Sequence, residues 1–316
     1  MKKLMIAATA ALCATVGFSL ESANVVGYSN VNAGQGKWTM VGVQFQEIGS
    51  TSQNLFDYVK TSAAAVTRSN MENGAMMLVR NGNVYNYYYY LSDAFDNATF
   101  SAEFDWEAWE ALAEEDEDAA AEMYDAAAAD PKYYSKAWGD PTGTLVTDVT
   151  VDIGDSVWYY NVSTASELTL AGEVNNTSSF AIPCGEGLTM IAKPYPKSLN
   201  FSDMSFATLT PAASMEDAIL MMVMGSNGAY SFYYYLADAF DNATFSAEFD
   251  WEAWEALAEE DEDAAAEMYD AAAADPKYHS AGWADPTGVS VSGEAAPLGN
   301  GFWIQMPSAD TVTIVK

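Results

Sequence analysis

Two short runs of carboxylates are the most concentrated chemical groups in this sequence. The letters EEDED occupy 114–118 and 259–263, inside a 41-residue segment that covers 93–133 and recurs unchanged over 238–278. Calcium prefers several carboxylate oxygens as ligands, but the segment has no glycine and no D-x-D-x-D-G run, which excludes an EF-hand. Diffuse calcium binding is therefore one candidate role, and we expect no other cofactor, at these ten residues: Glu114, Glu115, Asp116, Glu117, Asp118, Glu259, Glu260, Asp261, Glu262 and Asp263.

The same acids fit two other interpretations, a plain solvated face and a docking surface for a basic partner. In a helix, Glu103 with Glu107, Glu110 with Glu114, and Glu114 with Asp118 would place like charges four residues apart. Each such pair costs a helix roughly 0.2–0.5 kcal/mol. Cations near the segment would therefore stabilise it.

Runs of tyrosine form the second chemical feature, in YNYYYY (85–90) and SFYYY (231–235). Side chains alternate between the two faces of a strand, so one set can enter the core while the other is exposed or covered by the acidic segment through Trp106 and Trp109. Exposed tyrosines offer flat apolar faces with a polar tip, which suit sugars or a protein partner. The candidate ligand-binding residues are Tyr87, Tyr88, Tyr89, Tyr90, Tyr233, Tyr234 and Tyr235.

Nucleophilic and metal chemistry find little support in the sequence. His279 is the only histidine, and its counterpart in the first copy is Tyr134, so we expect a solvated loop residue without a catalytic role. Cys184 is the only cysteine beyond the N-terminal segment, and we expect it to be buried as a small apolar residue. Zinc sites of Cys and His are excluded by these counts, and no glycine-rich phosphate loop follows a strand. We predict that the protein is not an enzyme.

The acidic charge is concentrated in the repeated segment. The chain has a formal net charge of −33, and each 41-residue copy holds 14 acidic residues and one lysine, so the two copies carry −26 of it. A field of this sign repels nucleic acid and anionic membranes, which we exclude as partners.

The N-terminus has the pattern of a signal peptide. Lys2 and Lys3 precede the apolar stretch LMIAATAALCATVGFS, and small residues at 17 and 19 indicate cleavage ahead of Leu20, so 1–19 is the predicted signal. No other stretch is long and apolar enough to span a bilayer. We expect an exported protein, extracellular or on a bacterial cell surface, without a transmembrane segment in the mature chain.

An internal repeat with an offset of 145 extends beyond the identical segment. Trp158 pairs with Trp303, the motif at 138–143 pairs with that at 283–288, and ELTLA (167–171) pairs with VTIVK (312–316). The repeat divides the chain into related modules over 24–171 and 172–316, each interrupted by one acidic segment.

Both modules have the composition of β-structure. The expected strands are short, rich in Val, Thr, Tyr and Trp, and bounded by Gly, Asn, Asp and Pro: WTMVGVQF, VYNYYYYL, SVWYYNV, ELTLAGEV, YSFYYYL, GFWIQM and TVTIV. Several such strands per hundred residues favour a sandwich or barrel over a parallel α/β sheet. The predicted fold class is mainly β, with two tandem β-sandwich-like modules, each with an inserted acidic helical segment.

The inserted segment has a helical pattern. Asp105 is a good N-cap for WEAWEALAEE, an apolar stripe continues through Met123, Tyr124 and Ala127, and the proline at 131 ends it. We expect two short helices, or one bent helix, with the EEDED run at or near the break.

Several motifs outside the acidic segments resemble those of a family of exported bacterial proteins. ANVVGY, GKWTMVGVQF, GEGLTMIAKPYPKSLNFSDM, GDSVWYYNV and LTLAGEV are similar to patterns of the types G-[FW]-N-L-I-A-N-P-L, P-G-x-G-F-[FW] and L-T-[FL]-x-G-E-V. That family is found in verrucomicrobia-like and related phyla, and C-terminal β modules of secreted Bacteroidetes proteins look similar too. The resemblance implies an exported, strand-rich module and carries no activity or site residues.

Taken together, these features predict a non-catalytic exported surface or matrix protein that acts in adhesion or assembly, with calcium as a candidate aid. Its partner would be a second copy or another surface protein. The alternative is a carbohydrate-binding protein that holds a glycan with exposed Tyr and Trp side chains.

Overall fold

The computed structural model describes residues 26–50, 52–81, 84–162 and 165–316. The predicted signal peptide lies outside the described residues. The fold is mainly β, built from several antiparallel sheets with a sandwich-like arrangement, as the strand composition predicts. We call 26–174 module 1 and 179–316 module 2.

Module 1 consists of a five-stranded antiparallel sheet facing a smaller sheet. The five-stranded sheet has the order β2 (Trp38–Gly42), β10 (Ser156–Asn161), β6 (Ala75–Asn81), β7 (Val84–Phe95) and β8 (Tyr134–Gly139). The smaller sheet contains β1 (Val26–Ala33), β11 (Ser166–Val174), β3 (Phe45–Gln46) and β5 (Val59–Thr61), and β4 (Ser52–Asn54) pairs with β9 (Thr150–Asp152). The short helices α2 (Leu55–Tyr58) and η1 (Arg68–Asn73) connect these strands.

Module 2 repeats this plan. Its five-stranded sheet has the order β13 (Gly187–Ala192), β20 (Gly301–Met306), β16 (Ile219–Met224), β17 (Tyr230–Phe240) and β18 (His279–Ala284). The smaller sheet contains β12 (Ser179–Cys184), β21 (Asp310–Val315) and β15 (Met204–Phe206), and β14 (Leu199–Asn200) pairs with β19 (Glu294–Ala296) beside η3 (Phe201–Asp203).

The core of each module lies between its two sheets. In module 1, Val31 and Leu168 of the smaller sheet pack in one cluster with Val41, Met77 and Val157 of the larger sheet, all at most 5% exposed. The predicted strand WTMVGVQF divides into β2 and β3, which belong to different sheets. The chain therefore crosses from one layer to the other within this stretch.

The repeat is displaced by one residue in the last strand. The first residue of β5 lies opposite Leu170, and the first residue of β15 lies opposite Ile314. Leu170 therefore corresponds to Ile314, an offset of 144, and the predicted pairing of 167–171 with 312–316 is wrong by one residue. The alternation of buried and exposed positions decides the register, because a one-residue slip turns core side chains outward.

The two modules join through a pair of equivalent hydrogen bonds. The Gly42 N–H donates to the Gly299 carbonyl at 2.8 Å, and the Ala192 N–H donates to the Gly154 carbonyl at 2.7 Å. Gly42 corresponds to Ala192 and Gly154 to Gly299 in the repeat, so the junction has approximate two-fold symmetry. A Cβ on Gly42 would lie 2.5 Å from the Ala192 Cβ, so the close approach requires glycine on one side.

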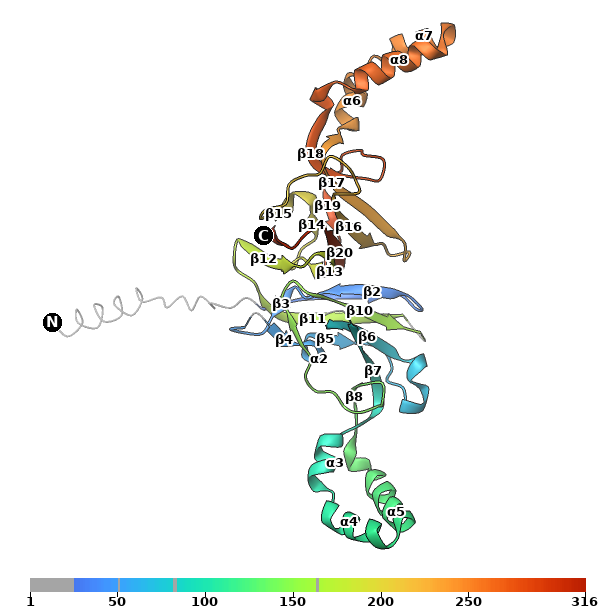
Figure 1. Cartoon of the computed structure of the whole chain (residues 1–316), viewed down its shortest axis with the longest axis vertical. Coiled ribbons are helices and arrows are strands. Elements are labelled where there is room, and N and C mark those ends of the chain that lie inside the picture. Colours follow the sequence, from blue (N-terminus) through green and yellow to red (C-terminus); the bar gives the residue numbers. More distant parts are fainter. Residues whose placement is uncertain (1–25, 51, 82–83, 163–164) are drawn as a thin grey trace, which may run out of the picture.

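The two acidic segments project from opposite ends of the molecule (Figure 1). Each leaves the long hairpin of its five-stranded sheet, between β7 and β8 or between β17 and β18. The first segment contains α3 (Asn97–Glu103), α4 (Trp106–Glu115), α5 (Glu117–Ala128) and η2 (Pro131–Tyr133). The second contains α6 (Asn242–Glu248), α7 (Trp251–Glu260), α8 (Glu262–Ala273) and η4 (Pro276–Tyr278).

Candidate functional site

Aspartates cap the helices of each acidic segment. Asp96 accepts a hydrogen bond from the Thr99 N–H at 2.9 Å and begins α3, a helix that sequence analysis missed. Asp105 caps α4 as predicted, and Asp116 caps α5. Each cap satisfies a backbone donor that the helix leaves free. Part of the acidic composition therefore serves helix termini.

The segment encloses a small aromatic core of its own. Phe100, Phe104 and Tyr133 are at most 8% exposed, and Trp109 and Tyr124 pack against them. The Trp109 Nε1–H donates to the Ala120 carbonyl at 3.0 Å, which ties α4 to α5. Trp106 and Trp109 therefore pack against each other and beside Tyr124, so the segment folds around its own side chains.

One ion pair closes the segment at its base. The Lys132 Nζ lies 2.8 Å from Glu103 Oε2, and the Tyr133 hydroxyl donates to the same oxygen at 3.1 Å. The hydrogen bond between Lys132 and Glu103 lowers the pKa of the Glu103 carboxyl and raises the pKa of the Lys132 ammonium group. The second copy repeats the arrangement with Lys277 and Glu248.

The candidate calcium residues lie together but remain in solvent. Glu114 and Glu115 end α4, Asp116 stands between the helices, and Glu117 and Asp118 begin α5, and all five are exposed. Within the described residues, no three or more His, Cys, Asp or Glu side chains are placed to hold a metal ion. The arrangement can hold a cloud of cations, and the described part of the chain shows no compact coordination site.

The break between the helices also changes the charge argument. Glu103 and Glu107 belong to different helices, as do Glu114 and Asp118. Of the three predicted like-charge pairs, only Glu110 with Glu114 lies within one helix, so the other two are wrong. The break at Asp116 relieves the repulsion that a continuous helix would impose.

The tyrosine runs divide between core and surface, as strand alternation predicts. Tyr88 packs edge-on against Phe56 at 5.4 Å, and Tyr90 packs against Trp138 at 5.2 Å. Tyr87 on the opposite face is 42% exposed, and Tyr89 is half-buried. The run therefore gives module 1 two core residues and two residues on the outer face of its sheet.

Module 2 divides its run in the same way. Tyr233 packs against Phe201 at 4.8 Å, and Tyr235 packs against Trp283 at 5.4 Å, and both are half-buried against the core. Tyr234 packs with a small cluster on the outer face. Phe232, which is 39% exposed, occupies the place of Tyr87. Of the seven candidate ligand-binding tyrosines, four serve the core, which leaves Tyr87, Tyr89 and Tyr234 on the outer faces.

The outer face of module 1 carries an aromatic group that was not predicted from the sequence. Trp38 stacks on Tyr160 with ring centroids 4.7 Å apart and meets Trp158 edge-on at 6.0 Å. Trp158 lies opposite Leu78, which in turn lies opposite Tyr87. A continuous apolar surface therefore runs across β2, β10, β6 and β7. The alternation of β10 carried the signal, since it places both Trp158 and Tyr160 on one face.

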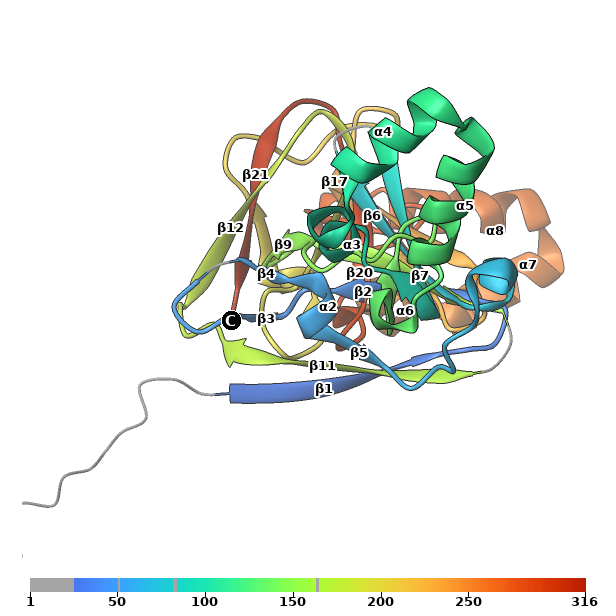
Figure 2. The ribbon, with the colours of Figure 1, turned by 90° about the horizontal axis from the view of Figure 1, so that it is seen from below.

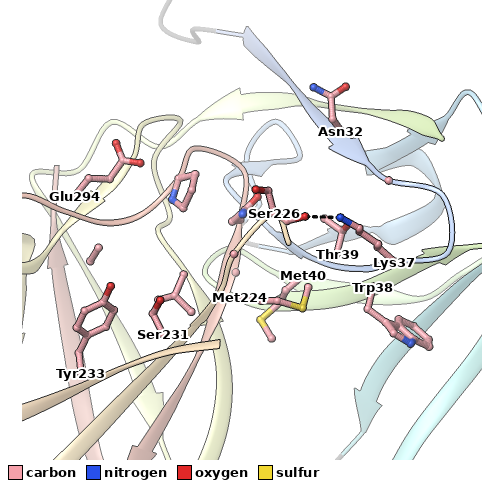
Figure 3. Close-up of a pocket in the computed structure, with 17 residues that line it drawn as sticks. Asn32, Lys37, Trp38, Thr39, Met40, Met224, Ser226, Ser231, Tyr233 and Glu294 are labelled. Atoms are coloured by element: carbon pink, nitrogen blue, oxygen red, sulfur yellow. Dashed lines mark hydrogen bonds between the residues drawn. The ribbon is translucent and has the colours of Figure 1, made fainter. Parts of the chain in front are cut away.

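Two of the cavities at the junction between the modules have aromatic side chains in their lining. One, of about 490 Å³, has a mixed lining that includes Asn32, Thr39, Ser231, Tyr233 and Glu294 (Figure 3). The other, of about 510 Å³, is lined by aromatic and apolar side chains with Lys37 and Asn227: Trp38, Leu78, Trp158, Met224 and Tyr230.

Lys37 stands between these cavities and links the modules. Its Nζ donates to the Ser226 carbonyl at 3.0 Å, from the turn after β1 to the β16–β17 hairpin (Figure 3). Lys37, Trp38 and Met224 line both cavities. The junction is thus a groove of flat aromatic surfaces with polar groups beside them, a lining typical of small-molecule sites.

The contacts of His279 and Cys184 indicate structural roles for both side chains. His279 begins strand β18, so the expectation of a loop residue is wrong. Its Nε2 lies 2.9 Å from the Ala273 carbonyl. In module 1 the Tyr134 hydroxyl donates a hydrogen bond to the equivalent carbonyl, that of Ala128. Cys184 is 3% exposed, as expected, and burial raises the pKa of its thiol to about 11.

Comparisons with known proteins give no further direction: no family model, no curated protein and no solved structure matches the chain. In the part of the chain that the structure describes, no helix is long and apolar enough to cross a membrane.

Proposed function

We propose that this chain is an exported, non-catalytic protein of a bacterial surface or extracellular matrix, acting in adhesion or assembly. The observation that carries the proposal is the presentation of two identical acidic helical units at opposite ends of one β-structured body (Figure 1). A molecule with two equal binding units can bridge two partners, and linked units gain avidity when both engage.

Charge supports this role. Each unit carries −13, with its five central carboxylates exposed between α4 and α5, or between α7 and α8. Two such surfaces on separate copies repel each other unless cations gather between them. Calcium suits this task, because it accepts many oxygen ligands in flexible geometry. The signal-like N-terminus and the family resemblance support export.

The test is the mass of the chain in solution, measured by light scattering with calcium and with chelator. Since Phe95 and Tyr134 are paired neighbours on β7 and β8, residues 96–133 can be replaced by an Asn-Gly turn, and 241–278 likewise. Calcium should enlarge the intact chain far beyond its mass in chelator, and it should leave the mass of a chain with neither unit unchanged.

Two results would contradict the proposal. Growth of the chain that lacks both units would move assembly to the β-body. An intact chain whose mass is the same in calcium and chelator would remove the calcium bridge. Magnesium serves as the matched cation, because its strict octahedral geometry and firmly held waters make it a poor bridge between flexible carboxylates.

A second function, carbohydrate binding, is favoured by the aromatic cavity at the junction. Trp38, Trp158 and Tyr230 present flat faces beside Lys37 and Asn227, a combination suited to the apolar face and hydroxyls of a neutral sugar. An array of neutral oligosaccharides is the direct assay. Binding should survive removal of both acidic units and fall at least tenfold in Trp38→Ala, with the exposed Trp106→Ala as the control.

A further inference from the structure

Most strand edges described in the structure are closed. The edge of β8 is covered by 144–146, where the Val146 N–H donates to the Trp138 carbonyl at 2.9 Å, and β18 is covered in the same way by the Val291 N–H. β2 and β13 meet the other module at the junction. β3, β4, β5, β9, β14, β15 and β19 are at most three residues long.

Strand β1 differs from all of these. It is eight residues long, pairs along its whole length with β11, and contains no charged residue and no proline. Figure 2 shows it along the outer margin of the ribbon, with β11 on one side. Tyr28 and Val26 are 76% and 65% exposed. A long open edge of this kind is a template for pairing with another strand.

The counterpart of β1 in module 2 is blocked. Ile182 lies opposite Val312 in β12–β21, as Val31 lies opposite Leu168 in β1–β11, so Pro183 occupies the place of Asn32. Proline is tolerated in a strand where its missing N–H would point away from the sheet. By this equivalence and by alternation, Tyr28, Asn30 and Asn32 direct their backbone groups away from β11.

A buried hydroxyl at the centre of β1 gives an independent observation. Ser29 is 6% exposed, and its Oγ has no hydrogen-bond partner among the described residues. Buried polar groups are normally paired, so this hydroxyl can still accept or donate a hydrogen bond to a group on a second chain.

We propose that β1 is a self-association edge, on which β1 of a second copy pairs antiparallel about a two-fold axis. Opposite residues must lie on the same face, so the register that aligns the whole edge places Tyr28 opposite Asn30 of the second copy. Ser29 then faces Ser29 of that copy, and the two hydroxyls can bond each other. The charge-free strand favours a second copy, since the acidic units project from the ends of the molecule (Figure 1).

This pairing does not depend on the acidic units, so its failure and that of the proposed function are separable. The chain from residue 20 onward should have twice the monomer mass in chelator, with both units present or both replaced by turns. Asn30→Pro removes an outward N–H and should halve the mass. Ala181→Pro, the equivalent change in β12, should leave the mass unchanged, and circular dichroism reports whether each variant is folded.

Cross-linking tests the register. In an antiparallel pair, opposite residues that form no backbone hydrogen bonds with each other have Cα atoms about 4.5 Å apart, within the range for a disulfide. Ser29 and Ser29 of the second copy would form such a pair. Ser29→Cys should give a covalent dimer on oxidation, whereas Asn30→Cys should not. Cys184 is buried and provides little background.

Three outcomes overturn the inference. The first is that the chain from residue 20 is monomeric and that a shorter chain, which begins at residue 26, is monomeric too. The second is a chain that dimerises only when begun at residue 26, because the chain's own preceding residues then occupy the edge. The third is a dimer unaffected by Asn30→Pro and not captured by Ser29→Cys.

Discussion

Phe100 should control the folding of the first acidic unit without affecting the β-body. The side chain is 1% exposed and packs within 5.5 Å, centroid to centroid, of four rings: Phe95, Phe104, Tyr124 and Tyr133. Replacing a buried phenylalanine by alanine costs about 3–5 kcal/mol. A unit of 41 residues is close to the size below which chains rarely fold alone, so this loss should exceed its local stability.

The expected result in Phe100→Ala is loss of α3, α4 and α5 with the sheets intact. The two units are identical in sequence, so the helical signal at 222 nm should fall by about half, and limited proteolysis should cut within 96–133. Phe245→Ala is an internal replicate in the second unit, and the exposed Glu107→Ala is the matched control. Unchanged helicity would refute the aromatic-core argument, and joint unfolding of the sheets would refute the independence of the unit.

Three further predictions concern the body. Lys193→Met should cost about 3–5 kcal/mol at pH 7, because Lys193 is 1% exposed and its Nζ lies 2.5 Å from Asp203. Burial raises the pKa of Asp203, but the hydrogen bonds from Lys193 and the Asn200 N–H, together with the nearby lysine charges, outweigh it and hold that pKa below its usual range. This stabilisation is complete above the ordinary carboxyl pKa and lost as pH falls through the lowered one. The unfolding free energies of variant and wild type, measured by urea titration, should therefore differ fully above about pH 4 and converge only as the pH falls well below it. Gly301→Ala should lower the melting temperature through overpacking of about 1–3 kcal/mol, since its Cβ would come 2.3 Å from a side-chain atom of module 1, whereas Gly185→Ala meets open space and serves as control. Hydrogen bonds to two carbonyls raise the pKa of His279, so its contribution is complete below about pH 6.5 and lost as pH rises through the raised pKa. At alkaline pH, protease should therefore cut the second unit faster than the first. Equal cutting rates at every pH would refute this, as would a difference that survives His279→Tyr.

Local pattern was sufficient to predict the strands and most of the helices. Alternating Val, Tyr and Trp indicated β7 and β10, and Asp105 with Pro131 indicated the limits of the helical segment. Helix α3 was missed because its pattern has a single buried residue, Phe100, and its cap is a residue that also favours turns. These are local signals, and short elements with one buried position leave little periodicity.

The candidate surfaces depended on information that local pattern lacks. Alternation divided the tyrosines into two faces, but only the pairing of the sheets shows that Tyr88 meets Phe56 inside and that Tyr87 remains outside. The aromatic junction cavity combines Lys37 with Tyr230, residues from different modules. Their contact follows from how two similar bodies pack, which a single repeat does not encode.

The contacts within the two identical units explain how one segment can be shared by two diverged modules. Each unit has its caps, its aromatic core and its base ion pair within its own 41 residues, and these contacts recur in both copies. At the boundary, Tyr134 and His279 differ, yet both bond the same carbonyl position of the unit. The body supplies a hairpin end and one hydrogen-bond donor to both units, and in module 1 the Arg68 N–H also donates to Asp93. Such a unit can be copied between modules without repacking either core, which is the property that display at two ends requires.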